Sequence, residues 1–145
     1  MKRRDFLSKS FASSVGLSAS MWLPASLLAS ELPADITELS SSALSAAIRQ
    51  RQVSAVEVMQ AYLQRIHRYN PVYNAIVSMV QDDKLLAQAR DADQALARGE
   101  YRGWMHGMPH AAKDQTAVAG LPYTSGSPVY ADRIAASDSP MVARI

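Results

Sequence analysis

Apolar positions recur every three or four residues in two stretches of the first half of the chain. In the first stretch, serines at 40–42 precede apolar residues at helical spacing, which predicts a short helix with one inward face. That face comprises Leu44, Ala47 and Ile48. In the second stretch, Ser54 and Glu57 have the spacing of a capping box, and a longer apolar stripe follows. The stripe comprises Val56, Met59, Leu63, Ile66 and Tyr69. We expect this helix to end at or just before Asn70, because Pro71 disfavours helical backbone in the residue before it.

The pattern changes between residues 74 and 99. The run NAIVSMV, residues 74–80, is apolar and partly β-branched, which predicts a buried strand. A helix is then predicted from Asp82–Asp83, which suit a helix N-terminus, to Gly99, which suits the position just past a C-terminus. Its inner face comprises Leu85, Leu86, Ala89, Ala92 and Leu96. A further short strand is expected over residues 108–114. This alternation of helices and strands predicts an α/β architecture.

The composition is that of a globular protein. Of the 145 residues, 48% are hydrophobic and 19% are charged, whereas disordered chains combine few apolar residues with a high net charge. The sequence contains no cysteine. Disulfides, a thiolate nucleophile and cysteine-ligated zinc or iron–sulfur centres are therefore excluded.

The net charge of +2 is unevenly distributed along the chain. Residues 1–30 contain four basic side chains and one acidic side chain, whereas the remaining 115 residues contain 11 basic and 12 acidic ones. The overall basicity therefore belongs to the N-terminus. The rest of the chain has no electrostatic reason to bind phosphate backbones, and we expect no nucleic-acid partner.

The first thirty residues have the layout of an export signal. A basic start is followed by a modestly apolar stretch interrupted by serines, and then by small residues. The pair Arg3-Arg4, followed by Asp5-Phe6-Leu7, resembles the twin-arginine signal of bacteria. A basic amphipathic helix or a membrane anchor is the alternative, but Pro24 and the serines interrupt the run of about 20 apolar residues that a spanning helix needs.

This layout predicts two parts of the chain. Residues 1–30 would be the signal peptide, with cleavage between Ser26 and Glu31, and residues 31–145 would be the mature domain. We therefore expect contact with the export machinery, a periplasmic or secreted product and no stable membrane anchor.

Lys113 lies in the segment MHGMPHAAKDQTAVAGLPYTSGSP, residues 105–128, which is rich in glycine, proline and small side chains. A solvated lysine is protonated at neutral pH and is a poor base. Burial without a counter-charge favours the neutral amine, which can take a proton from a serine hydroxyl. The apolar neighbours that favour burial are Ala111, Ala112, Ala117 and Val118. We expect Asp114 to face away from the amine and to bond backbone or cap a turn, since adjacent side chains of a strand point to opposite faces.

Several ordered segments resemble the amidase signature family. VSAVEVMQAYLQRI, NPVYNAIV and ARDADQALARGE are similar to the opening helices and first strand of that family, and DSPMVARI is similar to the start of its next helix. HGMPHAAKDQTAVAGLPYTSGS, residues 106–127, resembles the family segment that carries a catalytic lysine. The resemblance covers Leu39 to Ile145, which is almost all of the predicted mature chain.

The resemblance implies a mixed, twisted β-sheet wrapped by helices, of which this chain would hold the N-terminal part. It also implies hydrolysis of small-molecule carboxylic amides by a Ser–Ser–Lys triad, with no cofactor and no metal. In that mechanism the lysine deprotonates a bridging serine, which activates the nucleophilic serine. Lys113 is the one triad residue that carries over. The family places the serines in a Gly/Ser-rich region further along, so we expect this chain to be an amidase fragment that is inactive alone.

The remaining serine and histidine candidates are predicted to have structural or surface roles and not catalytic or metal-binding ones. Ser125 and Ser127 are interpreted as loop serines, because the family places its catalytic serines later. His106 and His110 are four residues apart, but the glycine and proline between them argue against the helix that such a metal pair needs. His67 is predicted to be a solvated histidine on the surface of a helix, since a lone side chain offers no chelate.

A different class of function is also compatible with the sequence. The chain could be a non-catalytic remnant or an interaction protein that retains the amidase N-terminal scaffold. In that case Lys113 would be an exposed, protonated side chain, as Lys-Asp pairs on protein surfaces commonly are.

Overall fold

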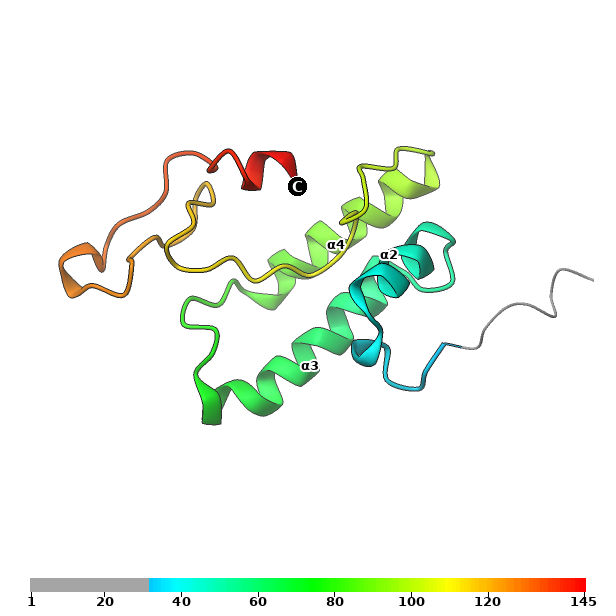
Figure 1. The fold of residues 1–145 in the computed structure, drawn as a ribbon, viewed down its shortest axis with the longest axis horizontal. Helices are drawn as coiled ribbons and strands as arrows, with labels where there is room; N and C mark the ends of the chain where they lie inside the picture. The colour runs from blue at the N-terminus through cyan, green and yellow to red at the C-terminus, as the bar shows by residue number, and fades with distance from the viewer. Residues whose placement is uncertain (1–31) are drawn as a thin grey trace, which may run out of the picture. The chain divides into compact units, whose positions relative to one another are not determined.

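The computed structural model describes residues 32–145, so the predicted signal peptide lies outside the described residues. Three α-helices account for most of the regular structure of this range (Figure 1). They are α2 (Ser41–Arg49), α3 (Ala55–Tyr73) and α4 (Asp82–Ala97). Short 3-10 helices are η2 (Ile36–Glu38), η3 (Pro128–Tyr130) and η4 (Val142–Arg144). The helix α3 lies alongside α4, whereas the chain after α4 is largely irregular (Figure 1).

The helix α2 forms where the sequence predicts it. The hydroxyl of Ser40 accepts a hydrogen bond of 3.2 Å from the backbone N–H of Ala43, which satisfies one of the free donors of the first turn. Leu44, Ala47 and Ile48 are buried, as their spacing requires. The predicted inward face is therefore confirmed.

The helix α3 begins with the predicted capping box. The hydroxyl of Ser54 accepts from the backbone N–H of Glu57 at 3.1 Å, and the carboxylate of Glu57 accepts from the backbone N–H of Ser54 at 2.8 Å. These reciprocal bonds also explain why the pKa of Glu57 lies below its ordinary value, with the bond from the Ser54 backbone as the largest cause.

The end of α3 differs from the prediction. The helix continues through Pro71 to Tyr73 and ends at Asn74, whose φ of 45° is left-handed. Proline has no N–H and leaves one carbonyl of the preceding turn without its helical donor, but one further turn still closes, because the Asn74 N–H donates to the carbonyl of Asn70 at 2.7 Å. The predicted end at Asn70 was therefore too early.

The helix α4 has the predicted start and end. Asp82 and Asp83 occupy its first turn, and Gly99 follows it with a φ of 84°. Its inner face is narrower than predicted, because Leu85 and Leu86 are only half-buried whereas Ala95 is fully buried. The guanidinium of Arg51 donates to the carbonyl of Leu96, which places a positive charge at the C-terminal end of this helix.

Two small apolar clusters hold the helices together. The first joins all three helices and comprises Leu44, Ala47, Ile48, Val53, Val58 and Leu96. Full burial of each larger aliphatic side chain in it contributes about 1.5–3 kcal/mol relative to exposure. The second comprises Ala55, Ala89 and Ala92, and it lies where α3 meets α4. Small side chains at these three positions let the two backbones approach closely.

The predicted mixed β-sheet is not present in residues 32–145, so the α/β assignment was wrong for this part of the chain. Residues 74–80, expected to be a strand, form no ladder with another backbone segment. Instead, the side-chain amide of Asn70 bonds both backbone groups of Ile76, accepting from its N–H at 2.8 Å and donating to its carbonyl at 3.0 Å. Val77 is 64% exposed. A strand requires a partner backbone, and here one side chain takes the place of that partner at a single residue.

The second expected strand, residues 108–114, is also irregular. The chain turns directly after it, since the carbonyl of Lys113 accepts from the N–H of Thr116 at 2.6 Å. In the described range, β pairing is limited to an isolated antiparallel bridge between Pro122 and Ile134. The fold of residues 32–145 is therefore a three-helix layer followed by a long hydrogen-bonded loop region.

Candidate functional site

The segment that carries Lys113 is attached to the helices by His106. This side chain is only 5% exposed. Its Nδ1 accepts a hydrogen bond of 3.1 Å from the backbone N–H of Arg102, and its Nε2 lies 2.9 Å from the carbonyl oxygen of Ala92 on α4. Nδ1 accepts from an N–H, whereas Nε2 faces a carbonyl oxygen that can only accept. The ring therefore carries its proton on Nε2. The imidazole therefore acts as a connector between α4 and the loop that follows it.

Gly107 brings the same segment against α3. Its φ is 71°, and a Cβ built on it would lie 2.8 Å from the Cβ of Ala55. Any side chain at this position would therefore collide with the start of α3 and would also occupy an unfavourable backbone conformation. The pair His106-Gly107 is thus a docking point of the loop on both long helices.

The histidines do not form a metal pair. Both ring nitrogens of His106 are engaged by backbone groups, and His110 is exposed. Across residues 32–145, no three side chains of the usual ligand types converge on one point. His67 is exposed, as predicted, and its Nε2 lies 2.7 Å from the carboxylate of Asp82 at the start of α4.

Lys113 is exposed on the surface of the described part of the chain. The burial that its small apolar neighbours favour is therefore not provided by residues 32–145. Ala112 and Ala117 are half-buried, but Ala111 is exposed. The ion pairs within this range do not include the Lys113 amine, so no carboxylate among the described residues lies within ion-pair distance of it.

Asp114, the next residue, is turned toward the loop at 124–126. Its carboxylate accepts from the backbone N–H of Thr124 at 3.0 Å, from the Thr124 hydroxyl at 2.6 Å and from the N–H of Gly126 at 2.8 Å. The bond from the Thr124 hydroxyl is the largest cause of a pKa below the ordinary value for this carboxyl, and the backbone N–H groups of Thr124 and Gly126 add to it. The expectation that Asp114 bonds backbone is confirmed, although the segment is not a strand.

The loop that Asp114 binds is itself closed by backbone pairing. The N–H of Tyr123 donates to the carbonyl of Arg133 at 2.9 Å, and the N–H of Ala135 donates to the carbonyl of Leu121 at 3.0 Å. The Arg133 guanidinium lies over two aromatic rings, with its central carbon 4.3 Å from the centroid of Tyr123 and 5.3 Å from that of Tyr130. Residues 114–135 are therefore ordered by contacts among themselves.

Ser125 and Ser127 belong to the turn of this loop. Ser125 has a left-handed φ of 54°, and its N–H donates to the carbonyl of Asp114 at 3.4 Å. The N–H of Ser127 donates to the carbonyl of Thr124 at 3.0 Å. Their backbone groups build the turn, in keeping with their interpretation as loop serines.

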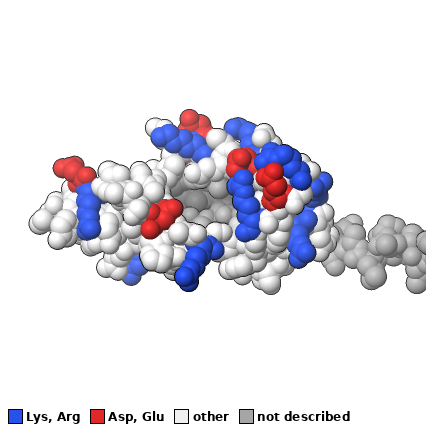
Figure 2. Space-filling model, turned by 90° about the horizontal axis from the view of Figure 1, so that it is seen from above, with Lys and Arg blue, Asp and Glu red and all other residues white. Residues whose placement is uncertain are grey.

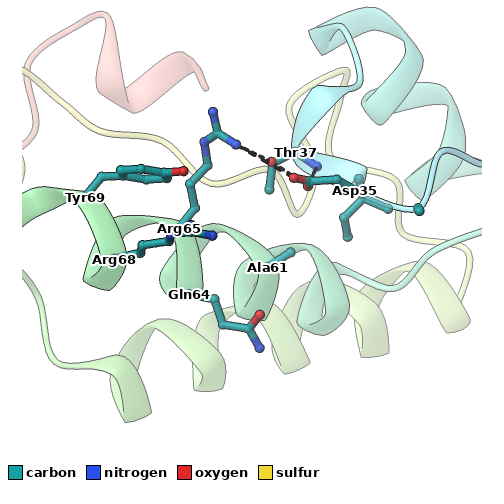
Figure 3. Close-up of a pocket in the computed structure, with 9 residues that line it drawn as sticks. Asp35, Thr37, Ala61, Gln64, Arg65, Arg68 and Tyr69 are labelled. Atoms are coloured by element: carbon teal, nitrogen blue, oxygen red, sulfur yellow. Dashed lines mark hydrogen bonds and ion pairs between the residues drawn. The ribbon is translucent and has the colours of Figure 1, made fainter.

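An open hollow of about 480 Å³ lies elsewhere, between η2 and α3 (Figure 3). The Arg65 guanidinium donates to the Thr37 hydroxyl at 3.3 Å and lies 3.8 Å from the Asp35 carboxylate. Arg65 and Arg68 also lie near the ring of Tyr69. None of the lining residues belongs to the segment 105–128. The hollow is therefore separate from the lysine loop.

Charges of both signs are interspersed on the face that Figure 2 shows. Within residues 32–145, exposed pairs include Arg98 with Glu100 and Arg102 with Asp91, each at 2.9 Å. Water screens exposed pairs of this kind, so they contribute little to the stability of the fold. Within residues 32–145, none of the helices combines the length and the apolarity of a membrane span.

The docked loop that carries Lys113 lies within a segment that sequence comparison assigns to a family. The profile of the Amidase family matches residues 57–145, which include most of α3, all of α4, Lys113 and the loop at 124–126. The chain belongs to the Amidase family.

Individual relatives agree with this family. An indoleacetamide hydrolase of Bradyrhizobium diazoefficiens is 40% identical over 97 residues, covering 67% of this chain and 18% of the relative. An acylamidase of Rhodococcus erythropolis is 35% identical over 107 residues, covering 74% of this chain and 22% of the relative. An amidase of Pseudomonas putida is 35% identical over 96 residues, covering 66% of this chain and 20% of the relative. The chain thus spans about a fifth of the length of these relatives.

Two contacts of the site have no counterpart in the sequence-based predictions. The buried role of His106 was missed, although the glycine directly after it is a signal for close backbone approach. The bond between Asp114 and Thr124 was also missed. The sequence feature that could have indicated this bond is that Asp114 and Thr124 both lie in the segment that resembles the lysine motif of the family.

Proposed function

We propose that this chain supplies the lysine base of an amide hydrolase, and that Lys113 is that base. The observation that carries the proposal is that the family match runs continuously through the lysine segment, residues 105–128. The relatives named as an indoleacetamide hydrolase and an acylamidase point to carboxylic amides as the substrate class. The relatives differ in the amide that their names specify, so the proposal extends to the amide bond and not to one substrate.

The proposed chemistry is a proton relay to a serine nucleophile. The neutral amine of Lys113 takes the proton of a bridging serine, and this serine takes the proton of the nucleophilic serine, which attacks the amide carbonyl. The acyl group is transferred to the serine, ammonia or an amine leaves with the returned proton, and water then releases the acid. The two serines are expected in a Gly/Ser-rich region, apart from the segments that resemble the opening of the family.

The exposure of Lys113 sets a condition for this chemistry. A lysine works as a base when its amine is unprotonated, and removal from water favours that form. In residues 32–145 the side chain is exposed. The proposal therefore requires that further polypeptide cover Lys113 in the active enzyme. Ammonia release from amides by the Lys113→Ala variant, compared with a Lys84→Ala control, tests the proposal.

A non-catalytic interaction protein is the second candidate, and the exposure of Lys113 favours it. In this alternative the lysine is a surface cation and the Asp114 bonds serve only to order the loop. The two candidates differ in the same experiment, because an interaction protein shows no Lys113-dependent release of ammonia.

We further propose that the chain is exported by the twin-arginine pathway to the periplasm or the outside of a bacterium. The support is the order of basic, weakly apolar and small residues in 1–30, with Arg3-Arg4 at its start. This pathway translocates folded proteins.

A further inference from the structure

The backbone around Lys113 is fixed on its C-terminal side by hydrogen bonds at two successive residues. The carbonyl of Lys113 accepts from the N–H of Thr116 at 2.6 Å. The side chain of Asp114 accepts the three bonds from Thr124 and Gly126, and its carbonyl accepts from the N–H of Ser125. The carbonyl of Lys113 is therefore held by Thr116, and the next residue, Asp114, is held by the loop ten residues further along.

Thr124 is the centre of this arrangement. Its hydroxyl donates to Asp114 at 2.6 Å and accepts from the N–H of Gly126 at 3.2 Å, while its own N–H donates to the same carboxylate. Hydrogen bonds to an ionised acceptor are shorter and stronger than those between neutral groups. The lowered pKa of Asp114 agrees with an ionised carboxylate that these donors stabilise.

On its N-terminal side Lys113 is far less constrained. The nearest anchors on the helices are the pair His106-Gly107 and the adjacent Met108, which packs against the first apolar cluster. The residues between these anchors and the lysine, 109–112, have no regular secondary structure. The position of the lysine backbone therefore depends on Asp114 more than on the helices.

We propose that Asp114 is a positioning residue for Lys113, acting through the hydroxyl of Thr124. The proposal rests on the proposed function of Lys113 as the base. Asp114 does not touch the amine, and its bonds are directed at the loop. Its role is to hold the lysine backbone in one place, so that the amine can reach the serine from a fixed direction.

Two substitutions at Thr124 separate a positioning role from a merely structural one. Thr124→Val keeps the shape but removes the hydroxyl, whereas Thr124→Ser keeps the hydroxyl but removes the methyl group. In the full-length enzyme we expect Thr124→Val to lower kcat about 10-fold or more with KM nearly unchanged, because displacements of about 1 Å can cost 100-fold. We expect Thr124→Ser to stay close to wild type. Equal kcat values for the two variants would overturn the proposal.

A second measurement does not depend on turnover. The lysines of the full chain are methylated with ¹³C-formaldehyde, and the methyl NMR signals of Lys113 and Lys84 are compared in wild type and in Asp114→Asn. We expect the Lys113 signal to shift or broaden and the Lys84 signal on α4 to remain. An unchanged Lys113 signal in Asp114→Asn refutes positioning, whereas wild-type turnover by Lys113→Ala refutes the base. The two failures are thereby distinguishable.

Discussion

The carboxylate of Asp93 on α4 accepts a hydrogen bond of 2.7 Å from the backbone N–H of Ala55, the first residue of α3. Its other oxygen accepts from the N–H of Val56 at 3.1 Å. A side chain of α4 therefore caps the N-terminus of the preceding helix α3, in addition to the capping box that α3 makes from its own residues. Since Gly107 packs on the same Ala55, the cap also supports the docking point of the lysine loop.

Asp93→Ala is expected to lower the free energy of unfolding by about 1–2 kcal/mol, because two N–H groups of the α3 N-terminus lose their acceptor. The measurement is the urea midpoint followed by circular dichroism. Asp91→Ala is the matched control on the same helix, since Asp91 makes an exposed pair with Arg102. The control is expected to change stability by less than about 0.5 kcal/mol. Equal losses for the two variants would contradict the capping role.

Gly107→Ala is expected to destabilise the fold by about 2–3 kcal/mol, since the added Cβ combines a collision with Ala55 and an unfavourable positive φ. Gly99→Ala is the control, because its φ of 84° is also positive but no atom lies within 4 Å of the built Cβ. The control is expected to lose about 1 kcal/mol. Thermal unfolding that shows equal losses would mean that the close approach to α3 contributes nothing.

Acid is expected to release the loop held by Asp114. The pKa of this carboxyl is lowered in the folded chain, so its contribution to stability is fully present above the ordinary value of 3.8 and is lost as the pH falls through the lowered value. The amide NMR signals of Thr124 and Gly126 should therefore be constant from neutral pH down to about pH 4 and should move below it. The same titration in Asp114→Asn should show no such movement. A midpoint above 3.8 for wild type would contradict the prediction.

Export can be measured by cell fractionation. Replacement of Arg3 and Arg4 together by lysine keeps the charge but removes the pair that resembles the twin-arginine signal. We expect wild type outside the cytoplasm and the double variant retained inside. A variant that changes Lys2 to arginine is the control and should be exported. Retention of wild type in the cytoplasm would refute the proposed export.

The helices were predictable because their signals are local. Ser40, Ser54 and Gly99 mark helix ends by short-range chemistry, and each marks the expected helix in the structure. The cap from Asp93 was not predictable in the same way, because it joins residues 38 positions apart. Nothing in the local pattern around Asp93 distinguishes it from a solvated acidic residue.

The two strand predictions were wrong for a different physical reason. An apolar, β-branched run such as residues 74–80 becomes a strand when another backbone pairs with it. In residues 32–145 no backbone does so, and Asn70 bonds Ile76 instead. Lys113 is exposed in residues 32–145, since small neighbours in sequence do not cover a side chain unless other segments pack over it, and its burial in the active enzyme stays a prediction. In contrast, Asp114 does bond backbone as expected, although the strand alternation from which this was predicted is not present.

The role of Lys113 is tested most directly by steady-state release of ammonia from a panel of primary amides, with the full-length enzyme and its Lys113→Ala and Lys84→Ala variants. Lys84 is an exposed lysine on α4, and its removal controls for the loss of a positive charge. We predict that Lys113→Ala lowers kcat by at least about 100-fold, because a general base contributes about 10²–10⁴-fold, while Lys84→Ala keeps wild-type turnover. Wild-type turnover by Lys113→Ala, with its fold intact by circular dichroism, would contradict the proposal that this lysine is the base.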